Sequence, residues 1–204
     1  MKRIITVILS LAASLVVMAQ VRITTPETEL IIKADKGADL QILYFGARLS
    51  DADAANIEAA GVPGHSAYRA YGLWCASEAS LGVTHADGNL STSLKVESVM
   101  QSDVIDNSIV TKVVMKDAVY PFYVTVCYRA YQDVDMIETW TEIANLGKKP
   151  VTLTRFDSGY LPVRVGDVWL SHLHGTWAAE GLLVQEPLQR GMKVIKNKDG
   201  SRNS

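Results

Sequence analysis

The chain has 204 residues, a formal net charge of −2 and a 48% share of hydrophobic residues. This balance is typical of a globular domain and excludes a disordered chain. The chain is shorter than the roughly 250 residues of a complete (β/α)₈ barrel. Its near-neutral charge provides no positive field for phosphates, so we expect no nucleic-acid partner.

The first 19 residues have the pattern of a secretory signal peptide. Lys2 and Arg3 precede an apolar run over residues 4–17, and small residues surround a cleavage point after Ala19. The run is shorter than the ~20 residues of a membrane-spanning helix. The sequence therefore predicts a cleaved leader and a mature chain, 20–204, that is periplasmic or extracellular and has no membrane attachment after cleavage.

The segment 50–61 carries the signals of a short helix. Ser50 can cap it, Asp51 and Asp53 place acids in its first turn, and Gly61 can end it. The segment is rich in alanine and has few large apolar side chains to bury. It therefore fits a short surface helix and an ordered loop equally well.

Apolar and polar residues alternate through much of the mature chain, which is the pattern of half-buried β-strands. In 122–131, one face carries Phe122, Val124, Val126 and Tyr128, and the other carries Thr125, Cys127 and Arg129. Similar runs occupy 109–115, 136–144 and 151–156. Turn-forming residues cluster at 35–37, 86–89, 132–135, 145–147 and 198–200. Short strands between such turns predict an all-β, antiparallel sandwich or barrel.

Two kinds of residue pair suggest chemistry. His172 and His174 would share one face of a strand and could offer two metal ligands, but no third ligand is evident. Carboxylate pairs occur at 51/53, 103/106 and 133/135, where Asp is favoured for bonding the backbone of turns. We therefore expect hydrogen-bonded histidines and turn-forming acids, with no metal, no cofactor and no catalytic residue.

Trp74 and the two cysteines leave alternatives open. Trp74 lies in a probable loop after Tyr71 and Gly72, where it could stack on a sugar or pack against the protein. Export permits a disulfide between Cys75 and Cys127, and two buried thiols fit as well.

Several stretches resemble, in the same order, the N-terminal domain of glycoside hydrolase family 36, the alpha-galactosidases. They are an early strand and turn at 40–49, a tyrosine-glycine stretch at 68–72, and the segments 78–88, 128–145 and 173–180. The resemblance covers nearly the whole mature chain. It implies an antiparallel β-supersandwich of the galactose-mutarotase type with at most one or two short helices.

The resemblance also implies where the reaction occurs. Members of the family hydrolyse terminal alpha-galactosides by a retaining mechanism, with an Asp nucleophile and an Asp acid/base on a (β/α)₈ barrel that follows this domain. We therefore expect this chain to end near the linker to a barrel that it lacks, and to be inactive alone. Its implied partners are that barrel and, in the full-length enzyme, further copies of itself.

In some tetrameric members, a loop near the tyrosine-glycine stretch reaches a neighbouring subunit's active site. The acidic and basic positions that follow the glycine in the family are Cys75 and Ser77 here. Trp74 is therefore the one substrate-binding candidate for a galactoside contact. A stand-alone carbohydrate-binding module and a structural, protein-binding sandwich are the alternative functions, followed by a metal enzyme that uses His172 and His174.

Overall fold

The computed structural model describes residues 20–61, 63–72, 78–162, 168–176, 179–189, 191 and 193–195. The predicted leader at 1–19 therefore lies outside the described residues. The chain divides into two compact units, Met1–Pro162 and Val163–Ser204. In the described ranges, no helix has the length and apolar character needed to cross a membrane.

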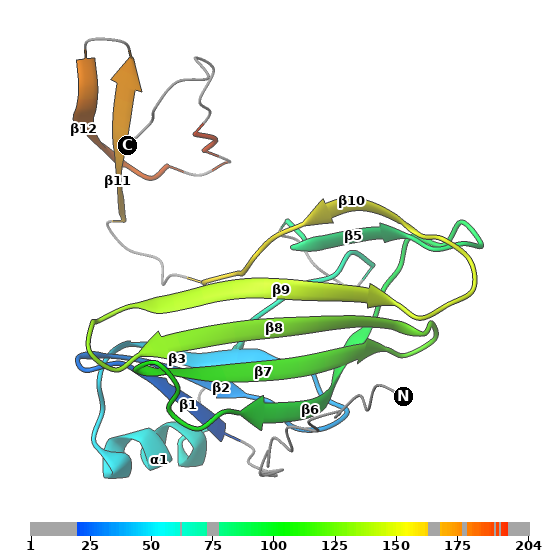
Figure 1. Cartoon of the computed structure of the whole chain (residues 1–204), viewed down its shortest axis with the longest axis horizontal. Coiled ribbons are helices and arrows are strands. Elements are labelled where there is room, and N and C mark those ends of the chain that lie inside the picture. Colours follow the sequence, from blue (N-terminus) through cyan, green and yellow to red (C-terminus); the bar gives the residue numbers. More distant parts are fainter. Residues whose placement is uncertain are drawn as a thin grey trace, which may run out of the picture. The chain divides into compact units, whose positions relative to one another are not determined.

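The first unit is built almost entirely of antiparallel β-strands (Figure 1). In chain order its described elements are β1 (Gln20–Thr24), β2 (Thr28–Lys33), β3 (Gln41–Ala47), α1 (Asp51–Ala59), β4 (His65–Ser66), β5 (Leu81–Thr84), β6 (Leu94–Gln101), β7 (Ser108–Asp117), β8 (Phe122–Tyr131), β9 (Ile137–Asn145) and β10 (Thr152–Phe156). They form two four-stranded sheets, ordered β1-β2-β3-β4 and β6-β7-β8-β9, and a two-stranded β10-β5 sheet. The predicted all-β, antiparallel class is confirmed.

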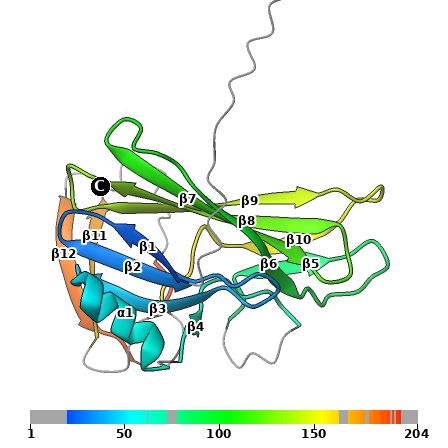
Figure 2. The same ribbon diagram turned by 90° about the horizontal axis from the view of Figure 1, so that it is seen from below.

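The two four-stranded sheets lie in separate layers (Figure 2). One cluster of buried side chains joins them, so the layers pack face to face as in a β-sandwich. The β1–β4 sheet contributes Ile23, Leu30, Ile32 and Ile42, among others, and the β6–β9 sheet contributes Val113, Met115, Phe122, Val124 and Val126. This shared core is the principal hydrophobic contribution to the stability of the first unit.

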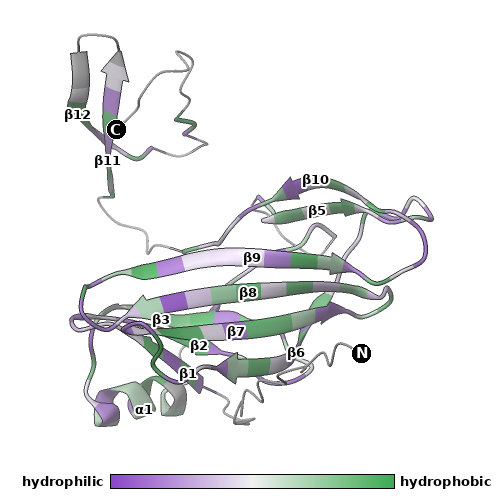
Figure 3. Cartoon of the chain, viewed as in Figure 1, coloured by the Kyte–Doolittle hydropathy of each residue, from purple (hydrophilic) through white to green (hydrophobic). Residues whose placement is uncertain are grey.

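The predicted alternation along 122–131 is confirmed in β8. Hydrophobic and more polar residues alternate along it and along its neighbour β7 (Figure 3). The four apolar-face residues of β8 are buried, whereas Thr125 and Arg129 are only half-buried. Cys127 is buried as well, although it belongs to the outer face, where its small side chain lies between its larger cross-strand partners Lys112 and Trp140.

The segment 50–61 forms a helix, α1, rather than a loop. The Ser50 hydroxyl accepts a hydrogen bond from the backbone N–H of Asp53 (3.2 Å) and donates one to the Asp53 carboxylate (2.7 Å). Ala54 is buried, so a small side chain lets the helix lie close to the rest of the unit. Gly61 follows the helix with φ +61°, the left-handed conformation common after helix ends.

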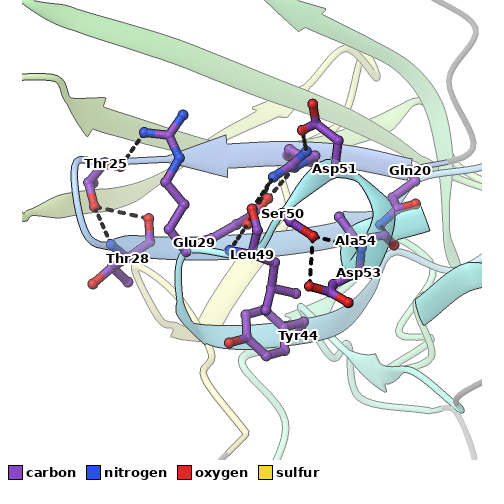
Figure 4. Close-up of polar contacts among 12 residues, drawn as sticks. Gln20, Thr25, Thr28, Glu29, Tyr44, Leu49, Ser50, Asp51, Asp53 and Ala54 are labelled. Atoms are coloured by element: carbon purple, nitrogen blue, oxygen red, sulfur yellow. Dashed lines mark hydrogen bonds and ion pairs between the residues drawn. The ribbon is translucent and has the colours of Figure 1, made fainter. Parts of the chain in front are cut away.

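A buried ion pair ties β1, β2 and the start of α1 together (Figure 4). Glu29 in β2 is fully buried and accepts hydrogen bonds from the Arg22 guanidinium and from the backbone N–H of Leu49 (3.0 Å). Arg22 also donates to Asp51 (2.6 Å), at the first residue of the helix. The hydrogen bond to Glu29 is the main cause that raises the pKa of Arg22 above its ordinary value.

Asp135 joins the turn between β8 and β9 to the turn between β1 and β2. Its carboxylate accepts hydrogen bonds from the hydroxyls of Thr25 and Thr28 (2.7 Å for Thr28) and from the backbone N–H of Glu27 (3.3 Å). The Thr25 and Thr28 hydroxyl bonds lower the pKa of Asp135 below its ordinary value of 3.8. The turns of the two sheets are therefore held together by an ionised side chain.

We expect the melting temperature of Asp135→Asn to fall less than that of wild type as the pH is lowered. Because the folded pKa lies below that of the unfolded chain, the contribution of Asp135 is complete above about pH 5 and is lost as the pH falls through the folded pKa. Melting temperatures across this range, followed by circular dichroism, test the prediction. Asp133→Asn in the same turn is the matched control, since Asp133 receives one long bond (3.5 Å) from Asn107. Parallel pH curves for wild type and Asp135→Asn would contradict it.

A turn covers the outer edge of β6. The N–H of Gly37 donates to the carbonyl of Val96 (2.8 Å), and the N–H of Val96 donates to the carbonyl of Ala38 (2.9 Å). Gly37 has φ +81°, which favours glycine at this point of the turn. The register between β6 and β7 shifts directly after Val96, so this edge is both paired and irregular.

The second unit contains an antiparallel hairpin of β11 (Trp169–Thr176) and β12 (Ala179–Pro187). Trp169 pairs with Pro187, and Leu173 pairs with Leu183, so these side chains share one face. Trp169, Leu173 and Leu183 are exposed within this unit. The hairpin thus carries an apolar strip, defined by these three residues.

Candidate functional site

A hollow of about 360 Å³ lies beside the tyrosine-glycine stretch and is here called the Tyr71 hollow. It collects residues from the 70–72 turn, from the 78–83 segment that includes β5, and from β10. Its lining is formed by Tyr71, Glu78, Ala79, Gly82, Val83, Leu90, Thr154 and Arg155. An exposed aromatic ring, a carboxylate, a guanidinium and a hydroxyl therefore meet at one place.

The backbone fixes Tyr71 at the edge of this hollow. Its N–H donates to the carbonyl of Leu81 (2.9 Å), and its carbonyl accepts from the N–H of Thr92 (3.0 Å). Gly72 follows with φ +105°, and a Cβ there would lie 2.6 Å from the Cα of Ser91, so only glycine fits. The Tyr71 side chain nevertheless remains 57% exposed. The fold thus holds the backbone and leaves the ring accessible.

Arg155 organises the charges of the hollow. Its guanidinium forms ion pairs with Glu78 (2.5 Å) and Asp157 (3.2 Å). The bonds to Asp157 are the main cause that raises the pKa of Arg155. A planar guanidinium and carboxylates with fixed directions can exchange hydrogen bonds with the hydroxyls of a ligand, and the exposed Tyr71 ring can lie against its C–H surface.

Trp74, the predicted substrate-binding residue, lies outside the described residues, as do Cys75 and Ser77. Its contact with a sugar therefore stays a prediction. Sequence reasoning missed Arg155, which β10 brings to the hollow from more than 80 residues beyond Tyr71. No local spacing signals such a long-range approach.

His172 and His174 share one face of β11, where they pair with Val184 and Leu182. The Nε2 atom of His172 lies 3.8 Å from a carboxylate oxygen of Glu186, whose pKa is lowered by its bond to Lys193. Within the described ranges, no three or more His, Cys, Asp or Glu side chains form a group that could hold a metal ion.

The carboxylate pairs that can be placed have contacts within the fold. Asp51 pairs with Arg22, Asp53 binds the cap of α1, and Asp135 joins two turns. Asp106 lies in a turn with φ +49°. The carboxylates of Asp51, Asp53 and Asp135 are thus engaged in holding local structure.

Cys127 and Trp140 belong to the outer face of the β6–β9 sheet. Burial is the main cause that raises the pKa of the Cys127 thiol to about 12, so it is a poor nucleophile at neutral pH. The thiol is free in the structure, and its possible partner Cys75 lies outside the described residues. The Arg129 guanidinium lies 5.2 Å from the centre of the Trp140 ring, a cation–π contact between neighbouring strands.

Solved structures of alpha-galactosidases have the same fold over most of this chain. AgaA from Geobacillus stearothermophilus aligns with a TM-score of 0.71 at 18% identity, covering 84% of this chain and 28% of that one. AgaB from the same organism gives 0.73 at 19% identity, covering 88% and 29%. The alpha-galactosidase from Lactobacillus brevis gives 0.72 at 20% identity, covering 85% and 28%. The chain therefore spans less than a third of the length of these proteins.

No curated protein matches the sequence. Residues 38–204 match the family model described as the glycosyl hydrolase family 36 N-terminal domain. This match covers most of the chain and includes both the Tyr71 hollow and the β11–β12 hairpin. The chain therefore belongs to glycosyl hydrolase family 36, by way of that family's N-terminal domain.

Proposed function

We propose that the chain is the non-catalytic N-terminal β-sandwich of an exported alpha-galactosidase-like enzyme. The observation that carries this proposal is the continuous match of residues 38–204 to the N-terminal domain of the family. The similar solved proteins are alpha-galactosidases, and more than two thirds of their length lies beyond the region that this chain covers. The sandwich supports a catalytic (β/α)₈ barrel, which hydrolyses terminal alpha-galactosides.

The contacts of the described acids support a non-catalytic role. A retaining glycosidase needs two carboxyl groups about 5–5.5 Å apart on either side of a sugar bond. Asp51, Asp53 and Asp135 are instead held by donors of their own chain. We therefore place the nucleophile and the acid/base on the barrel.

Two surfaces support the proposed contacts with partners. The Tyr71 hollow has the side chains to contact a galactoside at the rim of an active site, and Trp74 follows it directly in the sequence. The apolar strip of Trp169, Leu173 and Leu183 suits a contact with the barrel or with another subunit. Export to the periplasm or the cell exterior rests on the leader at 1–19.

We expect the purified chain to release no p-nitrophenol from p-nitrophenyl alpha-galactoside above the uncatalysed rate, because the reacting carboxylates belong to the barrel. We also expect it to copurify with a family 36 barrel from the same organism and to raise the amount of soluble activity. Expression of the barrel alone is the control. Turnover by the chain alone, or a barrel that neither binds it nor gains from it, would overturn the proposal.

A further inference from the structure

A second hollow, of about 410 Å³, lies within the first unit and is here called the inter-sheet hollow. Residues of β2, β3, β8, β9 and the segment 158–161 line it. Its volume falls in the range of about 300–1,000 Å³ that is usual for small-molecule sites. Its lining is mainly apolar, with a few polar groups that include Thr28, Tyr128, Asp135 and Thr139.

Tyr128 contributes one of the polar groups in the lining of this hollow. It lines the hollow, and its side chain is only 5% exposed. Among the residues that the structure describes, none forms a hydrogen bond with its hydroxyl. Burial raises the pKa of Tyr128, so the phenol remains a proton donor. Because Tyr128 lines the hollow, its hydroxyl can donate a hydrogen bond to a ligand atom, which is a directed polar contact within a mainly apolar lining.

Asp135 provides a fixed acceptor in the same hollow. One carboxylate oxygen is bonded by Thr25 and the N–H of Glu27, and the other is bonded by Thr28. A carboxylate offers about four acceptor positions, so the oxygen bonded by Thr28 can accept a further hydrogen bond. The three donors also fix the direction of the carboxylate before any ligand arrives.

Aromatic side chains complete the lining. Phe45 is 49% exposed although it borders the hollow, and Tyr160 lines it with the Arg69 guanidinium 5.5 Å from the centre of its ring. Aromatic rings beside a separate donor and acceptor select a ligand that has both a C–H surface and hydroxyl groups. A simple cation would satisfy Asp135 but not the Tyr128 hydroxyl, and a hydrocarbon would satisfy neither.

We propose that the inter-sheet hollow binds one pyranose unit of a sugar. The C–H face of the ring lies on the aromatic lining, one hydroxyl accepts a hydrogen bond from Tyr128, and another donates one to Asp135. This inference goes beyond the proposed function, because the binding residues all belong to the first unit and need no barrel.

The test is a titration of the full 204-residue chain with methyl alpha-D-galactopyranoside, followed by calorimetry and by amide NMR shifts. We expect saturable binding that moves signals of β8, β9 and the turn between them. Tyr128→Phe should weaken the affinity about three- to tenfold, the usual value of one hydrogen bond. Phe45→Ala should weaken it about tenfold through the lost ring contact. Tyr123→Ala is the matched control, because this aromatic residue lies on the outer face of β8 and does not line the hollow, and it should bind as wild type.

Thermal melts of each variant establish that it is folded; Phe45 is exposed enough that its replacement should leave the fold intact. Cyclohexanol, which has a similar ring and one hydroxyl, should bind more weakly than the galactoside. Absence of saturable binding, equal affinity for cyclohexanol, an unchanged affinity of both folded Phe45→Ala and Tyr128→Phe, or a loss caused by Tyr123→Ala would overturn the inference. None of these outcomes bears on the hydrolysis assay, so the proposed function is tested separately.

Discussion

Replacing Glu29 with alanine is expected to lower the free energy of unfolding by about 3–5 kcal/mol, the usual cost of breaking a buried ion pair. Glu29 is fully buried and receives bonds from Arg22 and from the backbone of Leu49. Its removal leaves the Arg22 charge in a partly buried position and the Leu49 N–H without its acceptor. Urea unfolding, with the slope held in common, measures the change.

The control for Glu29→Ala is Asp51→Ala, which removes the exposed partner of the same arginine. Because Asp51 is fully exposed, its pair with Arg22 should contribute about 0–1 kcal/mol. The double variant Arg22→Met/Glu29→Ala should be more stable than Glu29→Ala alone, because it no longer holds a partly buried guanidinium that has lost its buried partner. If Glu29→Ala and Asp51→Ala lowered the free energy of unfolding equally, burial would not determine how much each ion pair of Arg22 contributes to stability.

Phe122→Ala should cost a similar amount, about 3–5 kcal/mol, because it opens a cavity in the core that joins the two sheets. Phe122 is 1% exposed and meets the edge of the buried His85 ring, with centres 5.8 Å apart. The neighbouring Tyr123→Ala is the matched control. Tyr123 is aromatic and adjacent but lies on the outer face, so its loss should cost at most about 1 kcal/mol.

The comparison of these two variants tests the orientation of β8. A slip of one residue would exchange the faces of the strand and bring Tyr123 into the core. Urea unfolding of both variants decides the matter. A larger loss for Tyr123→Ala than for Phe122→Ala would refute the register that the structure gives to β8.

The strands of the β6–β9 sheet could be predicted because their signal is local. One face of β8 contacts the core along its whole length, so the burial of each residue follows from its parity in the sequence. The strand β2 lacks this signal. Four consecutive residues, from Glu29 to Ile32, are buried, because Arg22 and the 48–50 segment cover the charged side chain that alternation would place in solvent. Only the tertiary structure explains a buried glutamate at that position.

The sites were harder to predict than the fold because each is assembled from distant segments. The Tyr71 hollow needs Arg155 from β10, and the inter-sheet hollow needs Phe45 from β3 together with Tyr128 from β8. The sequence identified Tyr128 as a core-face residue of its strand, which is correct. That it would line a hollow depends on the side chains that three other strands bring near it, and no pattern within β8 contains that information.

The turn that pairs with Val96 has a consequence for how this protein behaves in concentrated solution. Unpaired edge strands are templates on which a second chain can add, which is a common first step toward fibrils. Here the backbone groups of Val96 on that side are already bonded to Gly37 and Ala38, and the irregular register beyond them misaligns any incoming strand. At Val96, this edge of the β6–β9 sheet is therefore closed to an incoming strand by the chain's own backbone.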